Sequence, residues 1–427
     1  MESHTQHALF AAVCLLFAVS VSAQSSPQLL LQGRFGGDVD EDTGLGSLPV
    51  VFSWPASSVY ATFNSTSINA TLSALPPTNT SSQYARFAFY LDQTEAAVET
   101  ITPNDTTIRW GMTGLRSGLH NLTITKLSEA SYGEATLESL TVGRGGRFLT
   151  PELPTAFESG RRILFLGDSY TVGFGNVGGN TSCNLTMCQL KQTNGNCYPE
   201  LDSENAAVSW GPITAANLQA DYQVIAWSGA GLDTYAGFLP NGSRAYMTGM
   251  PDELPETIVP EVATLFGRQV AADNTSMVPA DNTTWVPQIV VLAGGTNDFH
   301  SAIPPSQEQW TSDNLNFMSQ LTEDFGNQMQ IILQVFPQEL QNQGVLTPNQ
   351  TSTYLQYMTS LYTAAQLEGM NNLHLLQLSG ANLPTANWCV HHPSAAADAN
   401  IAAQLTAYIN RLLPNYATSM YPRAVQV

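Results

Sequence analysis

From about residue 161, the chain alternates short apolar runs with longer segments of helical periodicity. The runs are rich in Val, Ile and Leu, as in strands that are covered on both faces. Parallel strands need long crossover connections, which helices usually supply. The sequence therefore predicts a five-stranded parallel sheet in a three-layer α/β/α domain. The predicted strands are 162–167, 222–227, 288–293, 330–336 and 373–378, and the predicted helices are 205–219, 258–271, 312–328, 351–369 and 394–412.

Residues 24–150 show a different pattern, in which short runs alternate apolar and polar residues between turn residues. This part has no convincing helical period, and its spacing is typical of a β-sandwich. We predict an N-terminal β-sandwich domain at 24–150, a proline-containing linker at 151–160 and the α/β domain at 161–427. The predicted β runs are 50–54, 58–63, 67–72, 85–91, 120–126 and 135–142.

The first 23 residues predict a signal peptide. The run from Leu9 to Val21 is apolar but too short to span a bilayer, and small residues surround a cleavage site after Ala23. Eleven Asn-x-Ser/Thr sequons agree with a secreted, extracellular glycoprotein. They lie at Asn64, Asn69, Asn79, Asn104, Asn121, Asn180, Asn184, Asn241, Asn274, Asn282 and Asn349.

The formal net charge is −20, from 14 basic and 34 acidic residues. A surface of this sign cannot follow a phosphate backbone, so we expect no nucleic acid partner and no anionic membrane partner. The charge agrees with a secreted protein that acts on a neutral polymer. It agrees equally well with a charge that serves only to keep the protein in solution.

The cysteines predict disulfide bonds and not a metal site. Cys14 lies in the signal peptide, and four cysteines remain in an oxidising compartment, which allows two bridges and three pairings. One hypothesis joins Cys389 to the loop at 183–197. The four are Cys183, Cys188, Cys197 and Cys389.

Residues suited to acyl transfer follow four of the predicted strands. Because parallel strands end at one edge of their sheet, we expect these groups to meet there. A serine can attack a carbonyl carbon, a histidine can take the serine proton, and backbone N–H groups with an asparagine amide can stabilise an oxyanion. The groups are Ser169, Ser228-Gly229-Ala230-Gly231, Gly294-Gly295-Thr296-Asn297-Asp298 and His391-His392-Pro393.

Each of these residues also has a structural interpretation. Ser169 could be a turn residue or a helix N-cap, and His392 could precede a helix that starts with Pro393 at position N1. Asn297 could be a strand-end turn residue, and His391 is the second choice for the base. We interpret the aspartates at 168 and 298 as loop hydrogen-bond acceptors.

The glycines from Gly173 to Gly178 match a dinucleotide fingerprint, but the first glycine lies six residues after the strand. The residues that follow cannot open an amphipathic helix, so we reject a nucleotide site.

All four groups resemble the conserved blocks of the SGNH (GDSL-type) hydrolases, over about residues 161–412. The earlier segment Gly118–Glu129, the later Gly-Arg-Phe-Leu and the stretch Gly167–Asn176 resemble carbohydrate esterase family 2. That resemblance covers nearly the whole mature chain. It implies a jelly roll followed by an SGNH domain, and removal of acetyl groups from xylan- or glucomannan-type sugars without a cofactor.

The resemblance also implies roles for single residues. Ser169 would be the nucleophile and His392 the general base, and the oxyanion hole would be formed by the N–H groups of Ser169 and Gly231 with the Asn297 side chain. Many SGNH enzymes have Asp three residues before the histidine, where this chain has Cys389. Family 2 members can use a Ser–His dyad that a backbone carbonyl orients. We take Trp388 as a candidate for stacking on a sugar ring, with a packed structural tryptophan as the alternative.

The sequence thus predicts a secreted, monomeric acetyl esterase that acts on acetylated polysaccharide. Two other functions remain open. A lipase or thioesterase would use the same residues on a long acyl chain, and an inactive homologue would be a carbohydrate-binding protein.

Overall fold

The computed structural model describes most of both predicted domains. The described residues are 26–40, 45–74, 85–102, 105–130, 135–152, 155–177, 203–226, 228–232, 234–238, 244–248, 285–299, 305–336, 346–380 and 392–419. The predicted signal peptide, all the cysteines and the predicted helix at 258–271 lie outside these ranges. Within them, no helix combines the length and the hydropathy that crossing a bilayer requires.

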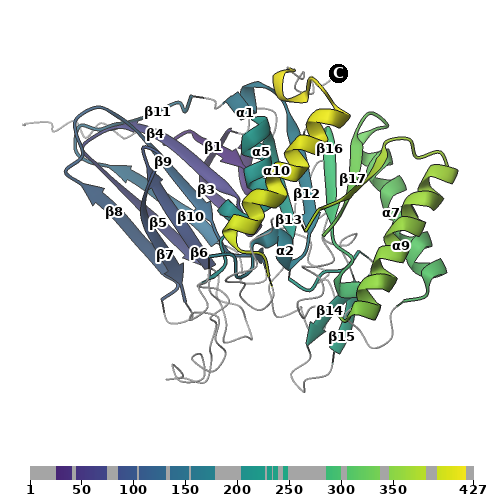
Figure 1. Cartoon of the computed structure of the whole chain (residues 1–427). Helices are drawn as coiled ribbons and strands as arrows, with labels where there is room; N and C mark the ends of the chain where they lie inside the picture. Colours follow the sequence, from purple (N-terminus) through teal and green to yellow (C-terminus); the bar gives the residue numbers. More distant parts are fainter. Residues whose placement is uncertain are drawn as a thin grey trace, which may run out of the picture.

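The N-terminal part forms one eleven-stranded sheet, drawn in purple and blue in Figure 1. Its strands run antiparallel in the order β7-β6-β9-β4-β1-β3-β10-β5-β8, with β11 on β4 and β2 on β3. Their bounds are β1 Leu29–Gln32, β2 Gly36–Asp40, β3 Leu45–Phe52, β4 Ser58–Asn64, β5 Ser67–Ala74, β6 Ala85–Leu91, β7 Thr94–Ile101, β8 Thr107–Thr113, β9 Leu119–Lys126, β10 Ala135–Val142 and β11 Arg147–Leu149.

This sheet folds over onto itself around a single core. Phe89 of β6 stacks on Trp110 of β8 with ring centroids 4.7 Å apart, although the two strands lie near opposite ends of the strand order. Phe52 of β3 meets Phe87 edge-on at 5.6 Å in the same core. The predicted all-β, jelly-roll architecture is confirmed. All six predicted runs form strands, and β1, β2, β7, β8 and β11 were not predicted.

The second part contains the predicted parallel sheet. Its order is β13-β12-β16-β17-β18, and every neighbouring pair is parallel. Helices α5 and α10 cover one face, and α7 and α9 cover the other (Figure 1). The strands are β12 Arg162–Gly167, β13 Asp221–Ala226, β16 Ile289–Ala293, β17 Gln330–Val335 and β18 Leu373–Gln377, and the helices are α5 Trp210–Leu218, α7 Gln307–Phe325, α9 Pro348–Leu367 and α10 Ala395–Leu412.

Alternate residues of each strand enter two different cores. On β12, Leu164 and Leu166 pack with Trp310 and Tyr354 of α7 and α9. Phe165 faces the other way and meets Trp210 of α5 edge-on at 5.4 Å. Because both faces are buried, the strands are mainly apolar, with exceptions such as Gln223 and Gln334, and this explains why the sequence identified them.

Two local predictions need correction. Predicted helix 205–219 is divided into a 3₁₀ turn, Ala206–Val208, and α5, since the backbone is extended at Ser209 between them. Pro212 lacks an N–H group and therefore lies in the first turn of α5. The predicted linker contains a short helix, α1 Thr155–Glu158, whose Phe157 is buried against Tyr60. The antiparallel hairpin β14 Thr234–Phe238 and β15 Arg244–Thr248 was not predicted.

Buried polar contacts join the two domains. Gln32 of the β domain donates to the Asp221 carboxylate of the α/β domain, and Arg34 Nε donates to Gln223 Oε1 at 2.8 Å. Trp54, from the loop after β3, is 1% exposed and belongs to a core cluster of the α/β domain. The β domain therefore packs directly against the α/β domain, through these hydrogen bonds and the buried Trp54 side chain.

Candidate active site

Ser169 lies at the point where the central strand β12 ends. Asp168 caps the short helix α2, Ser169–Val172, by accepting from Tyr170 N at 3.0 Å, so Ser169 is the first helical residue and not the N-cap. A Cβ atom on Gly167 would lie 1.8 Å from Thr171 Oγ1, so only glycine lets the helix turn back this closely. After one turn, Gly173 ends α2 at a φ of +77°. The first glycine of the rejected dinucleotide pattern, Gly173, thus ends a helix and does not open one.

His392 meets Ser169 across the sheet edge. Its Nε2 atom lies 2.7 Å from Ser169 Oγ, although the two residues are 223 positions apart in the sequence. The imidazole ring packs edge-on against Tyr170 at 5.0 Å and tilted against Phe174 at 4.7 Å. Ser394 caps α10, so Pro393 precedes the cap and is not the first helical residue.

Asn176 ties the serine side of the site to the histidine side. Its side chain donates to Asp398 Oδ2 in the first turn of α10 and to Asn205 O, both at 3.0 Å. Its backbone carbonyl accepts from Ala395 N at 2.8 Å. These contacts fix the start of α10, and His392 immediately before it, to the loop that follows Ser169. Our sequence analysis assigned no role to Asn176, because its partner in α10 lies 222 positions away.

The loop at 228–232 lies beside the serine through contacts with Asn297 and Asp298. Asn297 Nδ2 donates to Ala230 O at 2.8 Å and to Asp168 Oδ2 at 3.3 Å. Asp298 Oδ2 accepts from Leu232 N at 2.9 Å. Gly231 therefore lies between two fixed positions, Ala230 and Leu232. Both aspartates are buried hydrogen-bond acceptors, as the sequence predicted.

Burial dominates the electrostatics beside the serine. Asp168 is 2% exposed, and loss of solvent is the largest of the effects that together raise the pKa of its carboxyl group from 3.8 to about 7. The nearby Asp298 carboxylate also raises the pKa, whereas the hydrogen bond from Tyr170 N opposes the shift. A neutral Asp168 below pH 7 leaves less negative charge at the site where an oxyanion would form.

Other predicted site residues fall outside the described ranges. Trp388, Cys389 and His391 are among them, so their predicted roles stay predictions. Within the described ranges, no three His, Cys, Asp or Glu side chains lie together as metal ligands would.

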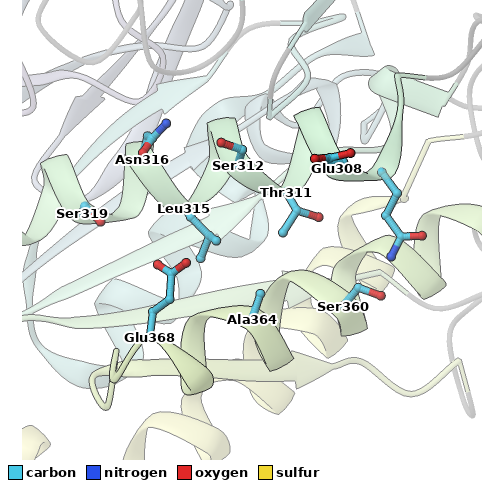
Figure 2. Close-up of a pocket in the computed structure, with 10 residues that line it drawn as sticks. Glu308, Thr311, Ser312, Leu315, Asn316, Ser319, Ser360, Ala364 and Glu368 are labelled. Atoms are coloured by element: carbon cyan, nitrogen blue, oxygen red, sulfur yellow. The ribbon is translucent and has the colours of Figure 1, made fainter.

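A separate cavity of about 620 Å³ lies between α7 and α9 on the outer side of the α/β domain (Figure 2). Its lining includes no residue of the four sequence blocks, so it is distinct from the Ser169–His392 pair. Lining side chains include Glu308, Thr311, Ser312, Asn316, Ser360 and Glu368.

Comparison with known proteins agrees with this geometry. Residues 163–405 match the GDSL-like lipase/acylhydrolase family, and residues 47–151 match the carbohydrate esterase 2 N-terminal family. The chain belongs to the GDSL-like lipase/acylhydrolase family. The two matches follow each other in the order that the resemblance to carbohydrate esterase family 2 implies.

Three similar proteins illustrate the relationship. Cellulase/esterase CelE of Acetivibrio thermocellus is 28% identical over 279 residues, which are 65% of this chain but only 28% of that protein. An acetylxylan esterase/glucomannan deacetylase of Cellvibrio japonicus is 26% identical over 310 residues, covering 70% of this chain and 71% of that one. A solved structure of a family two carbohydrate esterase from Clostridium thermocellum in complex with cellohexaose has a TM-score of 0.66 at 25% identity, covering 90% of this chain and 99% of that chain.

We predict that Asn176→Ala weakens both stability and ester hydrolysis. Loss of the amide leaves the buried Asp398 carboxyl group without this donor, so the free energy of unfolding should fall by about 2–3 kcal/mol. Displacement of His392 should lower kcat on p-nitrophenyl acetate by about 10-fold. The exposed Asn316→Ala is the control. An unchanged kcat in the folded Asn176 variant would show that the tie does not position the histidine.

We also predict that Asp168 makes the protein more stable in acid. The folded state holds the Asp168 proton up to about pH 7, whereas a model carboxyl group releases it near 3.8. The folded state therefore binds more protons in that interval, and the free energy of unfolding falls as the pH rises through it. The free energy of unfolding should be measured with urea at pH 4.5 and at pH 8. Its decrease between these two pH values should be smaller in Asp168→Asn than in the wild type, by up to about 4 kcal/mol. Asp324→Asn, at an exposed site, should keep the wild-type dependence on pH; equal slopes in all three proteins would contradict the prediction.

Proposed function

We propose that this protein is a secreted serine esterase that removes O-acetyl groups from cell-wall polysaccharides of the xylan or glucomannan type. The observation that carries the proposal is the 2.7 Å approach of His392 Nε2 to Ser169 Oγ. This distance permits direct proton transfer between a nucleophile and its base. The site opens where parallel strands end, the usual place for ligands in such sheets.

The reaction would proceed in two steps. In the first, Ser169 Oγ attacks the acetyl carbonyl carbon while His392 Nε2 takes the serine proton. The tetrahedral intermediate collapses, the histidine gives the proton to the departing sugar oxygen, and an acetyl-enzyme remains. In the second step, water gives a proton to His392 and attacks the acetyl group, and acetate leaves as the Ser169 hydroxyl is restored.

The negative oxygen of each intermediate needs hydrogen-bond donors. We assign this role to the backbone N–H groups of Ser169 and Gly231 and to the Asn297 amide. Asn297 Nδ2 carries two hydrogens, and its contact with Asp168 at 3.3 Å is longer than its contact with Ala230 O at 2.8 Å. The hydrogen that faces Asp168 makes the longer contact, so we assign the hydrogen bond to the oxyanion to this hydrogen. Losing one such donor typically costs about 3–4 kcal/mol of the barrier.

By the resemblance to family 2, a backbone carbonyl would orient His392 through Nδ1, since Cys389 stands where many SGNH enzymes have aspartate. A carbonyl can fix the tautomer of the ring, but it stabilises the imidazolium less than a carboxylate does. Trp388 remains our candidate for stacking on a sugar ring.

Three comparisons support a carbohydrate substrate. The N-terminal domain matches a family described by its occurrence in carbohydrate esterases, the Cellvibrio relative is named as an acetylxylan esterase and glucomannan deacetylase, and the similar solved structure holds cellohexaose. Secretion, a monomeric state, and the absence of nucleic acid and membrane partners stay predictions from composition and the N-terminal segment.

We predict that Ser169→Ala lowers kcat on p-nitrophenyl acetate and acetate release from acetylated xylan and glucomannan by at least about 10³-fold, because the nucleophile is lost. The melting temperature should shift by less than about 2 °C, since Ser169 is only partly buried. Ser360→Ala, a serine of the distant α7–α9 cavity, is the matched control and should keep full activity.

The same proteins decide between the alternatives. A series of p-nitrophenyl esters with rising acyl length should be cleaved best at acetate, and a preference for long chains would indicate a lipase or thioesterase. A fluorophosphonate should label the wild type and not Ser169→Ala. A wild type that does not react would indicate a carbohydrate-binding protein without catalysis.

A further inference from the structure

A side chain of the β domain reaches the loop that carries the proposed oxyanion donor. Glu129, three residues after the end of β9, accepts a hydrogen bond from the backbone N–H of Ser228 through Oε2 at 2.7 Å. Ser228 begins the segment Ser228-Gly229-Ala230-Gly231. The contact crosses from one domain to the other over 99 positions of sequence.

Glu129 is itself held rigidly. It is 3% exposed, its carbonyl oxygen accepts from Lys126 Nζ at 2.7 Å, and its backbone N–H donates to Glu204 Oε1. Lys126 also donates to Ser128 O at 2.8 Å. The segment 126–129 is thus fixed from the β domain by a lysine and from the α/β domain by a glutamate.

The cluster is fully buried, which makes its hydrogen bonds hard to rearrange. Lys126 and Glu204 are both 0% exposed. Burial lowers the pKa of Lys126 to about 7 and raises the pKa of Glu204, and the nearby Glu129 carboxylate raises the pKa of Glu204 further. Arg86 of β6 donates to Glu204 O at 3.1 Å and Leu127 O accepts from Ala206 N at 2.9 Å, so the two backbones are joined directly as well.

The loop that Glu129 holds is fixed at three alternate positions. Ser228 N donates to Glu129, Ala230 O accepts from Asn297, and Leu232 N donates to Asp298. Gly229, at a φ of +90°, has no side chain to limit the backbone between the first two positions. Without the first contact, the glycine-rich loop would be anchored on one side only. Oxyanion donors act only when they lie about 2.7–3.1 Å from the position of the charge, so small displacements matter.

We propose that Glu129 is a positioning residue through which the β domain sets the orientation of the Gly231 N–H group in the oxyanion hole. This inference rests on the proposed function of the Ser169–His392 site. It gives the β domain a part in the chemical step, besides any part in binding glycan. Glu129 touches no reacting atom and acts only through the backbone of the loop.

The test compares Glu129→Ala, Glu129→Gln and the control Arg34→Ala. Arg34 of the β domain also makes a hydrogen bond to the α/β domain, to Gln223 of β13. This strand leads into the loop, but Gln223 lies before the end of the strand. Endpoint titration with a fluorophosphonate counts competent sites in each protein, and kcat and KM on p-nitrophenyl acetate are then expressed per competent site.

Glu129→Ala should lower kcat per site by about 10- to 100-fold with KM changed by less than about 2-fold, since the lost interaction acts in the transition state. Glu129→Gln, which keeps an oxygen acceptor for Ser228 N, should recover kcat to within about 5-fold of the wild type. Arg34→Ala should lose stability but keep kcat per site.

Three results would overturn the inference: an unchanged kcat per site in Glu129→Ala, a loss confined to the number of competent sites, or an equal fall of kcat in Arg34→Ala. The Ser169→Ala variant separates this failure from failure of the proposed function. If that variant remains active, the Ser–His assignment is wrong; if it is inactive while Glu129→Ala is normal, only the positioning role is wrong.

Discussion

The burial of β12 on both of its faces and along both of its edges is the constraint on which the site depends. Every residue from Arg162 to Gly167 is buried, and the strand is hydrogen-bonded to β13 on one side and β16 on the other. The strand cannot shift by one residue without sending its core side chains to the opposite layer. The chain can turn only after Gly167, and the residue that then emerges is Ser169. The position of Ser169 is therefore fixed by the buried centre of the sheet.

The partners of Ser169 come from distant parts of the chain, and buried polar contacts hold them in place. Asn176 joins the start of α10 to the loop after the serine, Asn297 and Asp298 hold the glycine-rich loop, and Glu129 holds the same loop from the β domain. A single neutral hydrogen bond contributes only about 1 kcal/mol, but a buried group that loses its partner costs more. Such contacts have few alternatives in a dry interior, so they define one geometry more strictly than apolar packing does.

The sequence predicted the parallel sheet and the approach of Ser169 to His392 for the same reason. Strands buried on both faces are mainly apolar, and their common edge brings these two residues together whatever their separation in the chain. The strands that it did not reveal carry weaker signals. β7 is half-buried or exposed at most positions, and β1 has only four residues. Asn176 and Glu129 could not be assigned roles, because each depends on a partner that only the packed structure brings close.

Buried acids also determine how stability responds to pH. Glu204, Asp221 and Asp398 join Asp168 in having raised pKa values, each with burial as the largest cause. Every one of them binds its proton more tightly in the folded chain than in the unfolded chain, so each favours the folded state less as the pH rises above about 4. Lys126 acts in the opposite sense, because its pKa of about 7 in the folded state lies below the ordinary 10.5.

The penalty from Lys126 is constant below pH 7 and is relieved only between about pH 7 and pH 10. In the mildly acidic range these carboxyl groups stabilise the folded state more as the pH falls, and so does His120, whose pKa is raised by its hydrogen bond to the Arg116 carbonyl. His374, whose pKa is lowered by burial, acts in the opposite sense. A chain with 34 acidic residues and 14 basic ones also loses much of its self-repulsion in that range. Both effects have the same sign, so they favour a fold that is more stable at mildly acidic pH than at neutral pH.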